Sequence, residues 1–181
     1  MKIEETGFKG LLVIHPNVYR DDRGYFFEAF NRKVWQDLGF EEEWVQDNIS
    51  SSKYGTLRGL HYQVSPYGQS KLIRVAYGSV RDVVVDLRKD EPTYSQHYAI
   101  DLSSENNKIL LIPRGFAHGF ICKSETVIFS YKCDSYYSKS HETGINPLDR
   151  NLGIDWSVDK KDMILSEKDR NAPLWGEHKP Y

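Results

Sequence analysis

The stretch Ile112-Pro113-Arg114-Gly115-Phe116-Ala117-His118-Gly119-Phe120 contains the spacing P-x-G-x-x-H, and the earlier stretch Arg58-Gly59-Leu60-His61-Tyr62-Gln63 carries a second histidine. Two imidazoles alone rarely hold a divalent cation, because protein metal sites normally supply three or four ligands. An imidazole without a metal is the side chain best suited to general base catalysis near neutral pH. The two stretches therefore favour an acid–base enzyme over a metalloenzyme.

Short apolar runs surround these two stretches, and clusters of Gly, Pro, Asn, Asp and Ser separate them. This arrangement is typical of β-barrels and β-sandwiches. The clearest alternation is in 82–87, where Val83, Val85 and Leu87 share one face of a strand. The predicted strands are 10–14, 24–30, 44–51, 56–63, 71–77, 79–87, 96–102, 108–112 and 126–132.

Two short helices complete the predicted secondary structure. Asn31 is suited to cap a helix over 32–38, which Gly39 ends, and a second helical turn is predicted near Ser166. The last residues, 176–181, are predicted to fray. We expect an all-β fold with a few short helices, in which residues 1–181 form a single domain.

Composition narrows the class of protein. The net charge is −2 and the pI is about 6.3, so the chain lacks the basic field of a nucleic-acid-binding protein. No apolar run has the length of a membrane span, and the first residues do not resemble a signal peptide. Cys122 and Cys133 are too few for a disulfide framework. We therefore expect a cytoplasmic enzyme with neither nucleic-acid nor membrane partners.

Along nearly its whole length, the chain resembles the nucleotide-sugar epimerases of the cupin superfamily. The P-x-G-x-x-H spacing resembles the second cupin motif, whereas Gln63 stands where metal-binding cupins carry a second histidine. The resemblance is carried by 22–28, 46–50, 56–63, 78–83, 112–120, 142–145 and 165–169. Each segment alone is a weak signal, but all of them in this order are specific. The resemblance implies a cupin, or β-jelly-roll, barrel, which the strand pattern alone does not distinguish from a sandwich.

This family resemblance implies epimerisation at C3 and C5 of dTDP-4-dehydro-6-deoxy-D-glucose, a step of dTDP-L-rhamnose biosynthesis. Both hydrogens lie α to the 4-keto group, so inversion needs a base, an acid on the opposite face and a donor for the enolate. It requires no metal and no other cofactor. By resemblance, His61 is the base and Asp169 orients its ring. Tyr131 is the acid, while Lys71 and His118 face the oxyanion.

Each of these residues also has a purely structural explanation. Either histidine would suit a hydrogen bond to a neighbouring strand, and Tyr131 would suit the core with its hydroxyl at the edge. Lys71 opens an apolar strand, where charged side chains are usually solvated. Asp169 would ordinarily belong to a surface turn. Only the family resemblance favours a catalytic role for Asp169.

The resemblance further implies a site for a diphosphate and a pyrimidine base. Arginine suits bidentate phosphate contacts, and a tyrosine ring suits stacking on thymine. The implied binding residues are Arg23, Phe26, Glu28, Gln46, Asn48, Arg58, Tyr137, Glu142 and Lys168. Because Arg58 and His61 are three positions apart, strict alternation would send them to opposite faces. A β-bulge or a bend at Gly59 would reconcile them.

Two segments depart from the family pattern. Asn146-Pro147-Leu148-Asp149 stands where many members have Arg-Trp-Asn-Asp, and Ser157 replaces the usual proline after Trp156. Both lie outside the implied proton-transfer residues, so we expect them to affect loop shape more than chemistry. Related enzymes invert only C3 or only C5, or use another sugar nucleotide, and the motifs do not separate these cases.

Two other classes of protein compete with an epimerase. A metal-dependent cupin, such as a dioxygenase or a sugar isomerase, needs a third ligand beside the two histidines, and Gln63 is a poor one. A non-enzymatic sugar-binding cupin would be expected to have lost Tyr131 or the His61 and Asp169 pair, which this chain retains.

The resemblance also implies a homodimer, in which an amino-terminal strand of each subunit reaches the barrel mouth of the other. Arg23, Phe26 and Glu28 would be the residues contributed in this way. Segment 24–30 carries four aromatic residues, which is more than an exposed strand normally leaves uncovered.

Overall fold

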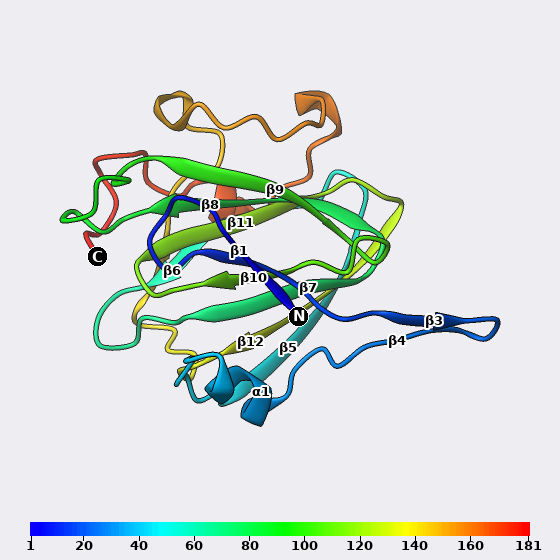
Figure 1. The fold of residues 1–181 in the computed structure, drawn as a ribbon. Coiled ribbons are helices and arrows are strands. Elements are labelled where there is room, and N and C mark those ends of the chain that lie inside the picture. The colour runs from blue at the N-terminus through cyan, green and yellow to red at the C-terminus, as the bar shows by residue number, and fades with distance from the viewer.

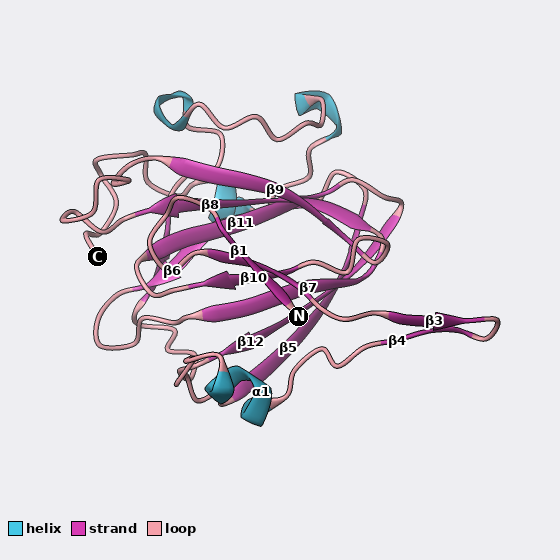
Figure 2. Ribbon diagram, in the orientation of Figure 1, coloured by secondary structure: helices cyan, strands magenta, loops and turns pink.

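The computed structural model describes residues 1–181, which form two large antiparallel sheets and a separate hairpin (Figures 1 and 2). The strands are β1 (Lys2–Glu5), β2 (Leu12–His15), β3 (Tyr19–Asp21), β4 (Gly24–Phe26), β5 (Gln46–Lys53), β6 (Leu57–Gln63), β7 (Lys71–Tyr77), β8 (Ser79–Asp86), β9 (His97–Ser103), β10 (Ile109–Ile112), β11 (Phe116–Cys122), β12 (Thr126–Cys133) and β13 (Glu142–Gly144).

The two large sheets face each other as a β-jelly-roll barrel of the cupin type. One sheet has the order β1-β2-β10-β7-β12-β5, and the other has the order β13-β6-β11-β8-β9. The β3–β4 hairpin extends away from both sheets (Figure 1). The expected all-β barrel is therefore confirmed. None of the helices is long and apolar enough to cross a membrane.

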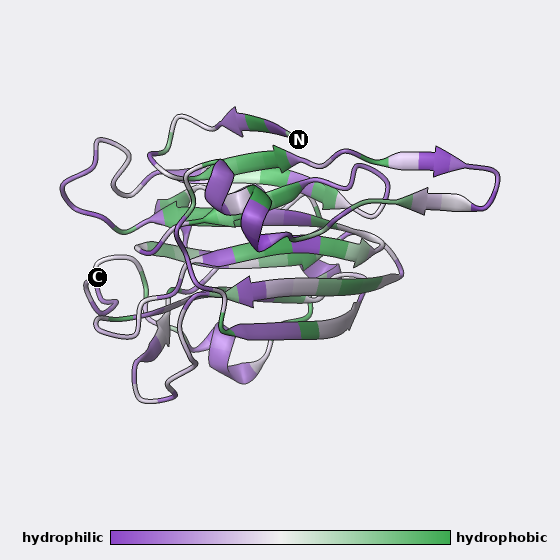
Figure 3. Ribbon diagram, turned by 60° about the horizontal axis from the view of Figure 1, so that its bottom comes forward, coloured by the Kyte–Doolittle hydropathy of each residue, from purple (hydrophilic) through white to green (hydrophobic).

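One apolar cluster fills the space between the two large sheets, and a smaller cluster lies on the outer face of each, so hydrophobic segments concentrate in the strands (Figure 3). Inside the barrel, the rings of Phe120 and Phe129 stack with centroids 4.1 Å apart. Outside the six-stranded sheet, α1 (Arg32–Asp37) buries Trp35. Trp156 and its neighbours after β13 cover the five-stranded sheet. This segment includes the 3₁₀ helices η1 (Arg150–Leu152) and η2 (Lys160–Asp162) and precedes α2 (Glu167–Arg170).

Most predicted elements are present with shifted bounds. Helix α1 begins after Asn31, whose side chain caps it as predicted, and α2 begins after Ser166. The strand predicted over 24–30 ends at Phe26. The sequence does not predict β1, β3, β11 or β13. Strand β11 is buried along its whole length, so it shows none of the alternation that reveals a half-buried strand.

The predicted fraying of residues 176–181 is wrong. The Tyr62 hydroxyl donates a hydrogen bond to the carbonyl of Lys179. The ring of His178 lies 4.6 Å from the ring of Trp175, measured between centroids. Tyr181 packs beside Gly68, where a Cβ would lie 2.6 Å from the Tyr181 hydroxyl oxygen, and beside Gly115, where a Cβ would lie 3.2 Å from the Tyr181 ring. Polar and aromatic contacts therefore hold this terminus against the barrel.

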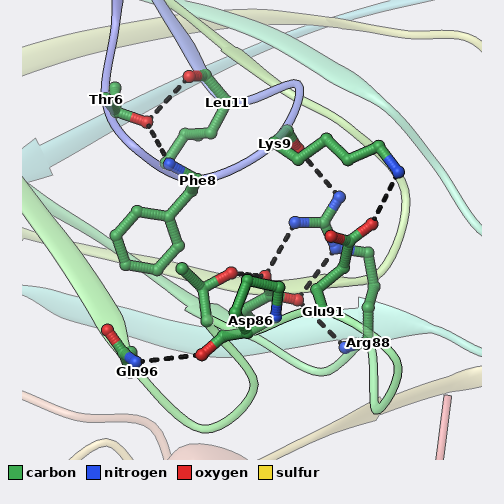
Figure 4. A network of polar contacts seen from close by, with 10 residues as sticks. Thr6, Phe8, Lys9, Leu11, Asp86, Arg88, Glu91 and Gln96 are labelled. Atoms are coloured by element: carbon green, nitrogen blue, oxygen red, sulfur yellow. Dashed lines mark hydrogen bonds and ion pairs between the residues drawn. The ribbon is translucent and has the colours of Figure 1, made fainter.

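A network of charged side chains connects the loop before β2 to the loop after β8 (Figure 4). The fully buried carboxylate of Asp86 accepts hydrogen bonds from Arg88 Nε at 2.9 Å, from Arg88 Nη2 at 2.7 Å and from the Thr93 hydroxyl at 2.6 Å. Burial would raise the pKa of Asp86, but these hydrogen bonds hold it below its usual value. Arg88 also donates to the Lys9 carbonyl at 2.8 Å, and Lys9 pairs with Glu91 at 3.0 Å. The network thus joins the loop before β2 to the loop after β8.

We expect Arg88→Ala to lower the free energy of unfolding by about 3 kcal/mol at pH 7, because it leaves the Asp86 carboxylate buried without its counter-charge. The folded-state pKa of Asp86 is depressed from its ordinary 3.8. The stability from this pair is therefore present above that value and is lost as the pH falls through the folded pKa. Urea unfolding of both proteins at neutral and acid pH measures the difference.

Lys161→Ala is the matched control, because Lys161 and its partner Asp159 are both about three-quarters exposed. Its loss should be below about 1 kcal/mol. Equal losses in the two variants would show that burial of the Arg88 pair contributes nothing.

Candidate active site

A bulge in β6 turns both Arg58 and His61 into the barrel. On the neighbouring strand β11, His118 pairs with His61 and Phe120 pairs with Arg58. The interval from Arg58 to His61 is three residues long on β6, whereas the interval from His118 to Phe120 is two residues long on β11, and this difference defines a β-bulge. Gly59 supplies the extra residue with φ of 129°, and a Cβ there would lie 2.5 Å from the Cα of Gly119. Only glycine fits this position. A bulge, one of the two arrangements anticipated from the sequence, therefore places Arg58 and His61 on one face.

A cleft of about 640 Å³ opens where these strands meet β5, β7 and β12. Eight of the predicted residues line it: Asn48, Arg58, His61, Lys71, His118, Tyr131, Lys168 and Asp169. A smaller hollow of about 120 Å³ shares four of these residues and adds Gln46, Tyr137 and Glu142. The fold thus gathers eleven of the fourteen predicted site residues around one continuous site.

His61 and Asp169 form a hydrogen-bonded pair, although 108 positions separate them in the sequence. His61 Nε2 lies 2.6 Å from Asp169 Oδ1, and the carboxylate is almost completely buried. Burial would raise the pKa of Asp169, but the hydrogen bonds from His61 and from the Ser166 cap lower it below its usual value. A carboxylate only accepts, so Nε2 carries a proton in this pair, and in the neutral form of the ring Nδ1 has a free lone pair.

His118 belongs to a second pair, whose carboxylate the sequence analysis missed. His118 Nε2 lies 2.9 Å from Asp82 Oδ2, and Asp82 is fully buried. The other Asp82 oxygen, Oδ1, has no hydrogen-bond partner in the chain. The signal was available in the strand alternation. Val83 and Val85 pack on the outer side of the sheet, so Asp82 must point into the barrel.

Lys71 of β7 and Tyr131 of β12 lie on neighbouring strands of the six-stranded sheet and line the same cleft. Burial lowers the pKa of Lys71, while Cys133 and the carboxylates of Asp82 and Glu142 act in the opposite direction. Burial raises the pKa of Tyr131, so its hydroxyl holds its proton more firmly. Both side chains are partly buried, so Lys71 is not a fully solvated strand end.

The mouth of the cleft carries polar side chains. The Tyr137 hydroxyl donates to Glu142 Oε2 at 2.9 Å, and Lys168 Nζ donates to the same oxygen at 2.5 Å. Burial acts to raise the pKa of Glu142, but these two contacts lower it below its usual value. Arg58 Nε donates to the Ser52 hydroxyl at 3.0 Å. The positive charges of Lys168 and Arg58 therefore lie near the opening of the cleft, where an anionic ligand would enter.

Three predicted residues do not reach the cleft of their own chain. Arg23 and Phe26 lie on the β3–β4 hairpin, where Arg23 pairs with Asp21 at 2.6 Å. The Glu28 carboxylate accepts a hydrogen bond from Asn31 at 2.9 Å, beside α1. Figure 1 shows the hairpin extending away from the barrel.

The chain matches known proteins along almost its entire length. A family model described as dTDP-4-dehydrorhamnose 3,5-epimerase matches residues 5–177. The dTDP-4-dehydrorhamnose 3,5-epimerase of Shigella flexneri is 45% identical over 173 residues, which is 95% of this chain and 94% of that protein.

Two crystal structures share the fold. The dTDP-4-dehydrorhamnose 3,5-epimerase of Elizabethkingia anophelis NUHP1 aligns with a TM-score of 0.93 and 48% identity, covering 100% of this chain and 99% of that one. A dTDP-6-deoxy-D-glucose-3,5-epimerase of Legionella pneumophila Philadelphia 1, in complex with dTDP-4-keto-L-rhamnose, aligns with a TM-score of 0.91 and 44% identity, covering 96% and 92%. The chain belongs to the dTDP-4-dehydrorhamnose 3,5-epimerase family of isomerases.

Proposed function

We propose that the protein inverts C3 and C5 of dTDP-4-dehydro-6-deoxy-D-glucose, giving dTDP-4-dehydro-L-rhamnose in dTDP-L-rhamnose biosynthesis. The observation that carries the proposal is the grouping of two His–Asp pairs, a tyrosine and a lysine around one cleft. The hydrogens at C3 and C5 both lie α to the 4-keto group, so one set of acid–base residues can serve both carbons. Membership of the family supports this choice of substrate.

Proton removal is the role that we assign to His61. Its Nδ1 lone pair takes the proton from carbon, and the buried Asp169 carboxylate stabilises the imidazolium that forms. Tyr131 returns a proton to the opposite face of the carbon. Burial raises the pKa of Tyr131, which keeps the phenol protonated until the enolate needs its proton.

The enolate between these two steps carries its charge on the C4 oxygen. We assign its stabilisation to Lys71 and His118, which line the same cleft. In this role His118 donates to the C4 oxygen through Nδ1 while Nε2 donates to Asp82, so both ring nitrogens carry a proton. The ring is then an imidazolium, and the Asp82 carboxylate balances its charge. In this enclosed interior such donors act more strongly than they would in water.

The nucleotide portion occupies the mouth in this proposal. Arg58 and Lys168 contact the diphosphate, where arginine offers a planar pair of donors. Tyr137 is half exposed and offers a ring for stacking on thymine. Gln46, Asn48 and Glu142 contribute the remaining polar contacts.

Deuterium exchange tests the reaction. In D₂O, we expect the protein to incorporate solvent deuterium at both C3 and C5 of dTDP-4-dehydro-6-deoxy-D-glucose, because each inversion passes through an enolate. NMR of the recovered sugar reads the two positions separately. Exchange at one carbon only would replace the proposal with a single-site epimerase acting on a related 4-keto sugar.

The same assay after dialysis against EDTA addresses the metal-dependent alternative. Both Nε2 atoms of the cleft histidines already face aspartates, and the electrophilic groups of the proposal belong to the protein itself. We expect full exchange after dialysis. Loss of exchange that Zn²⁺, Fe²⁺ or Mn²⁺ restores would establish a metal-dependent enzyme instead.

Replacement of the base is the second test. We expect His61→Ala to reduce kcat by about 10²–10⁴-fold or more, the usual contribution of a general base, while dTDP affinity and the fold persist. Asp169→Ala should be milder, because the imidazole remains. His15→Ala is the matched control, since His15 pairs with Glu4 on β1, away from the cleft. Near-normal turnover by His61→Ala would remove His61 from the mechanism.

We further propose that the protein is a homodimer whose subunits exchange their β3–β4 hairpins. Tyr19, Tyr25 and Phe26 are 65%, 48% and 66% exposed on this hairpin, an apolar surface that a free arm would leave in water. A two-fold pairing would cover it and carry Arg23 and Glu28 to the cleft of the partner.

We also propose a cytoplasmic location, because Cys122 and Cys133 are buried and unpaired, as thiols are in reducing compartments.

Complementation tests the shared site. An Arg23→Ala/Glu28→Ala protein and a His61→Ala protein should each be inactive. After mixing and subunit exchange, about a quarter of the sites should regain every residue, because half of the dimers are mixed and one of their two sites is intact. Turnover of the mixture is compared with each protein alone. Sedimentation as a monomer, or no recovery despite exchange, would assign each site to one subunit.

A further inference from the structure

The catalytic carboxylate Asp169 lies on an element that is too short to hold itself in place. Helix α2 comprises only four residues, and a single helical turn is unstable without external contacts. Its amino end is capped when the Ser166 hydroxyl accepts a hydrogen bond from the Asp169 backbone N–H at 3.1 Å. Contacts with neighbouring segments must therefore fix where the carboxylate stands. Lys168 within α2 pairs with Glu142 of β13, and two further anchors lie on either side of α2.

The first anchor joins the chain before α2 to the start of β6. The Ile164 N–H donates to the Gly55 carbonyl at 2.8 Å, and the Leu57 N–H donates to the Ile164 carbonyl at 2.9 Å. These bonds use backbone atoms only. They fix one end of the segment beside the strand that carries His61.

The second anchor depends on one side chain, that of Asn146. Its Nδ2 donates to the Arg170 carbonyl at 2.9 Å, and its backbone N–H donates to the Pro173 carbonyl at 2.9 Å. The Arg170 carbonyl ends α2 and lacks a partner within the helix. The Leu148 N–H donates to Asn146 Oδ1 at 2.9 Å, which fixes the amide so that Nδ2 faces Arg170.

Asn146 is itself positioned by the strand that pairs with His61. Gly144 of β13 pairs with His61, and the backbones of Leu60 and Ile145 exchange hydrogen bonds of 3.1 and 2.9 Å. A continuous path of short contacts thus runs from His61 through β13 and Asn146 to α2. Asp149 adds a second tie, because its buried carboxylate accepts a hydrogen bond from the Trp175 N–H at 2.6 Å.

We propose that Asn146 is a positioning residue that sets the distance between Asp169 and His61. It touches neither the cleft nor the proposed substrate, and it acts only through the end of α2. The inference rests on the proposed function, since the His61–Asp169 distance affects turnover only where His61 is the base.

The test compares Asn146→Ala and Asn146→Asp with wild type. We expect kcat to fall by about 10–100-fold in both, with KM changed less than about twofold, because misplacement of a catalytic group by about 1 Å costs up to about 10²-fold. The aspartate keeps the acceptor for Leu148 but loses the donor to Arg170, so it separates the two contacts. Asn151→Ala is the control, because that exposed side chain makes no hydrogen bond, and it should behave as wild type.

A double-mutant cycle distinguishes positioning from general damage. On an Asp169→Ala background, Asn146→Ala should cause no further loss of kcat, because the carboxylate that it positions is gone. An equal additional loss on that background, or wild-type kcat in the single variant, would overturn the proposal.

Amide hydrogen exchange provides a readout that does not depend on turnover. In Asn146→Ala, exchange should accelerate at residues 166–171 and remain unchanged in β6 and β11. Unchanged exchange at 166–171 would also overturn the proposal. A wild-type protein that exchanges no substrate deuterium would refute the proposed function alone, while this measurement would still decide whether Asn146 fixes α2.

Discussion

The bulge at Gly59 is the constraint on which the site depends. Its extra residue sends Arg58 and His61 into the barrel, while Leu60 and Tyr62 pack outside, against the carboxyl-terminal part of the chain. The backbone there passes so close to β11 that a Cβ on Gly119 would lie 2.7 Å from the Arg58 carbonyl. Two facing glycines are therefore needed, one on each strand. The close approach in turn puts the second histidine of the cleft directly opposite His61.

The interior formed in this way is unfavourable for stability but suited to catalysis. Burying Asp82, Lys71 and His118 costs desolvation free energy that hydrogen bonds offset only in part, as the unpartnered Asp82 oxygen shows. The stacked rings of Phe120 and Phe129 give the cleft an apolar wall. Polar groups held in a dry, fixed arrangement need no reorganisation when charge develops on a substrate. The large apolar core between the sheets supplies the stability that such an arrangement removes.

Local patterns in the sequence predicted an all-β fold, and the family resemblance added the barrel and most of the residues that line the cleft. Alternation indicated half-buried strands, ordered motifs contained His61 and Asp169, and the family resemblance added Tyr131. Features that depend on tertiary contacts were harder to predict. Strand β11 is buried on both sides and has no alternation to detect. The inward direction of Asp82 could have been read from its neighbours, but its pairing with His118 requires the register between β8 and β11. The docking of Tyr181 likewise depends on glycines far away in the sequence.

The site is assembled from distant segments because the barrel and the segments outside its sheets contribute different parts of it. A jelly roll supplies walls whose geometry is fixed by strand pairing, but the mouth of the cleft lies at the edge of the sheets. Residues there must come from segments outside them, such as the one that carries Asp169. These segments are held by a few polar contacts, so substitutions in them change the fit at the mouth at small cost to the core. Residues 146–149 belong to such a segment, because Asn146 holds the end of α2 and lies outside the strand that carries the base.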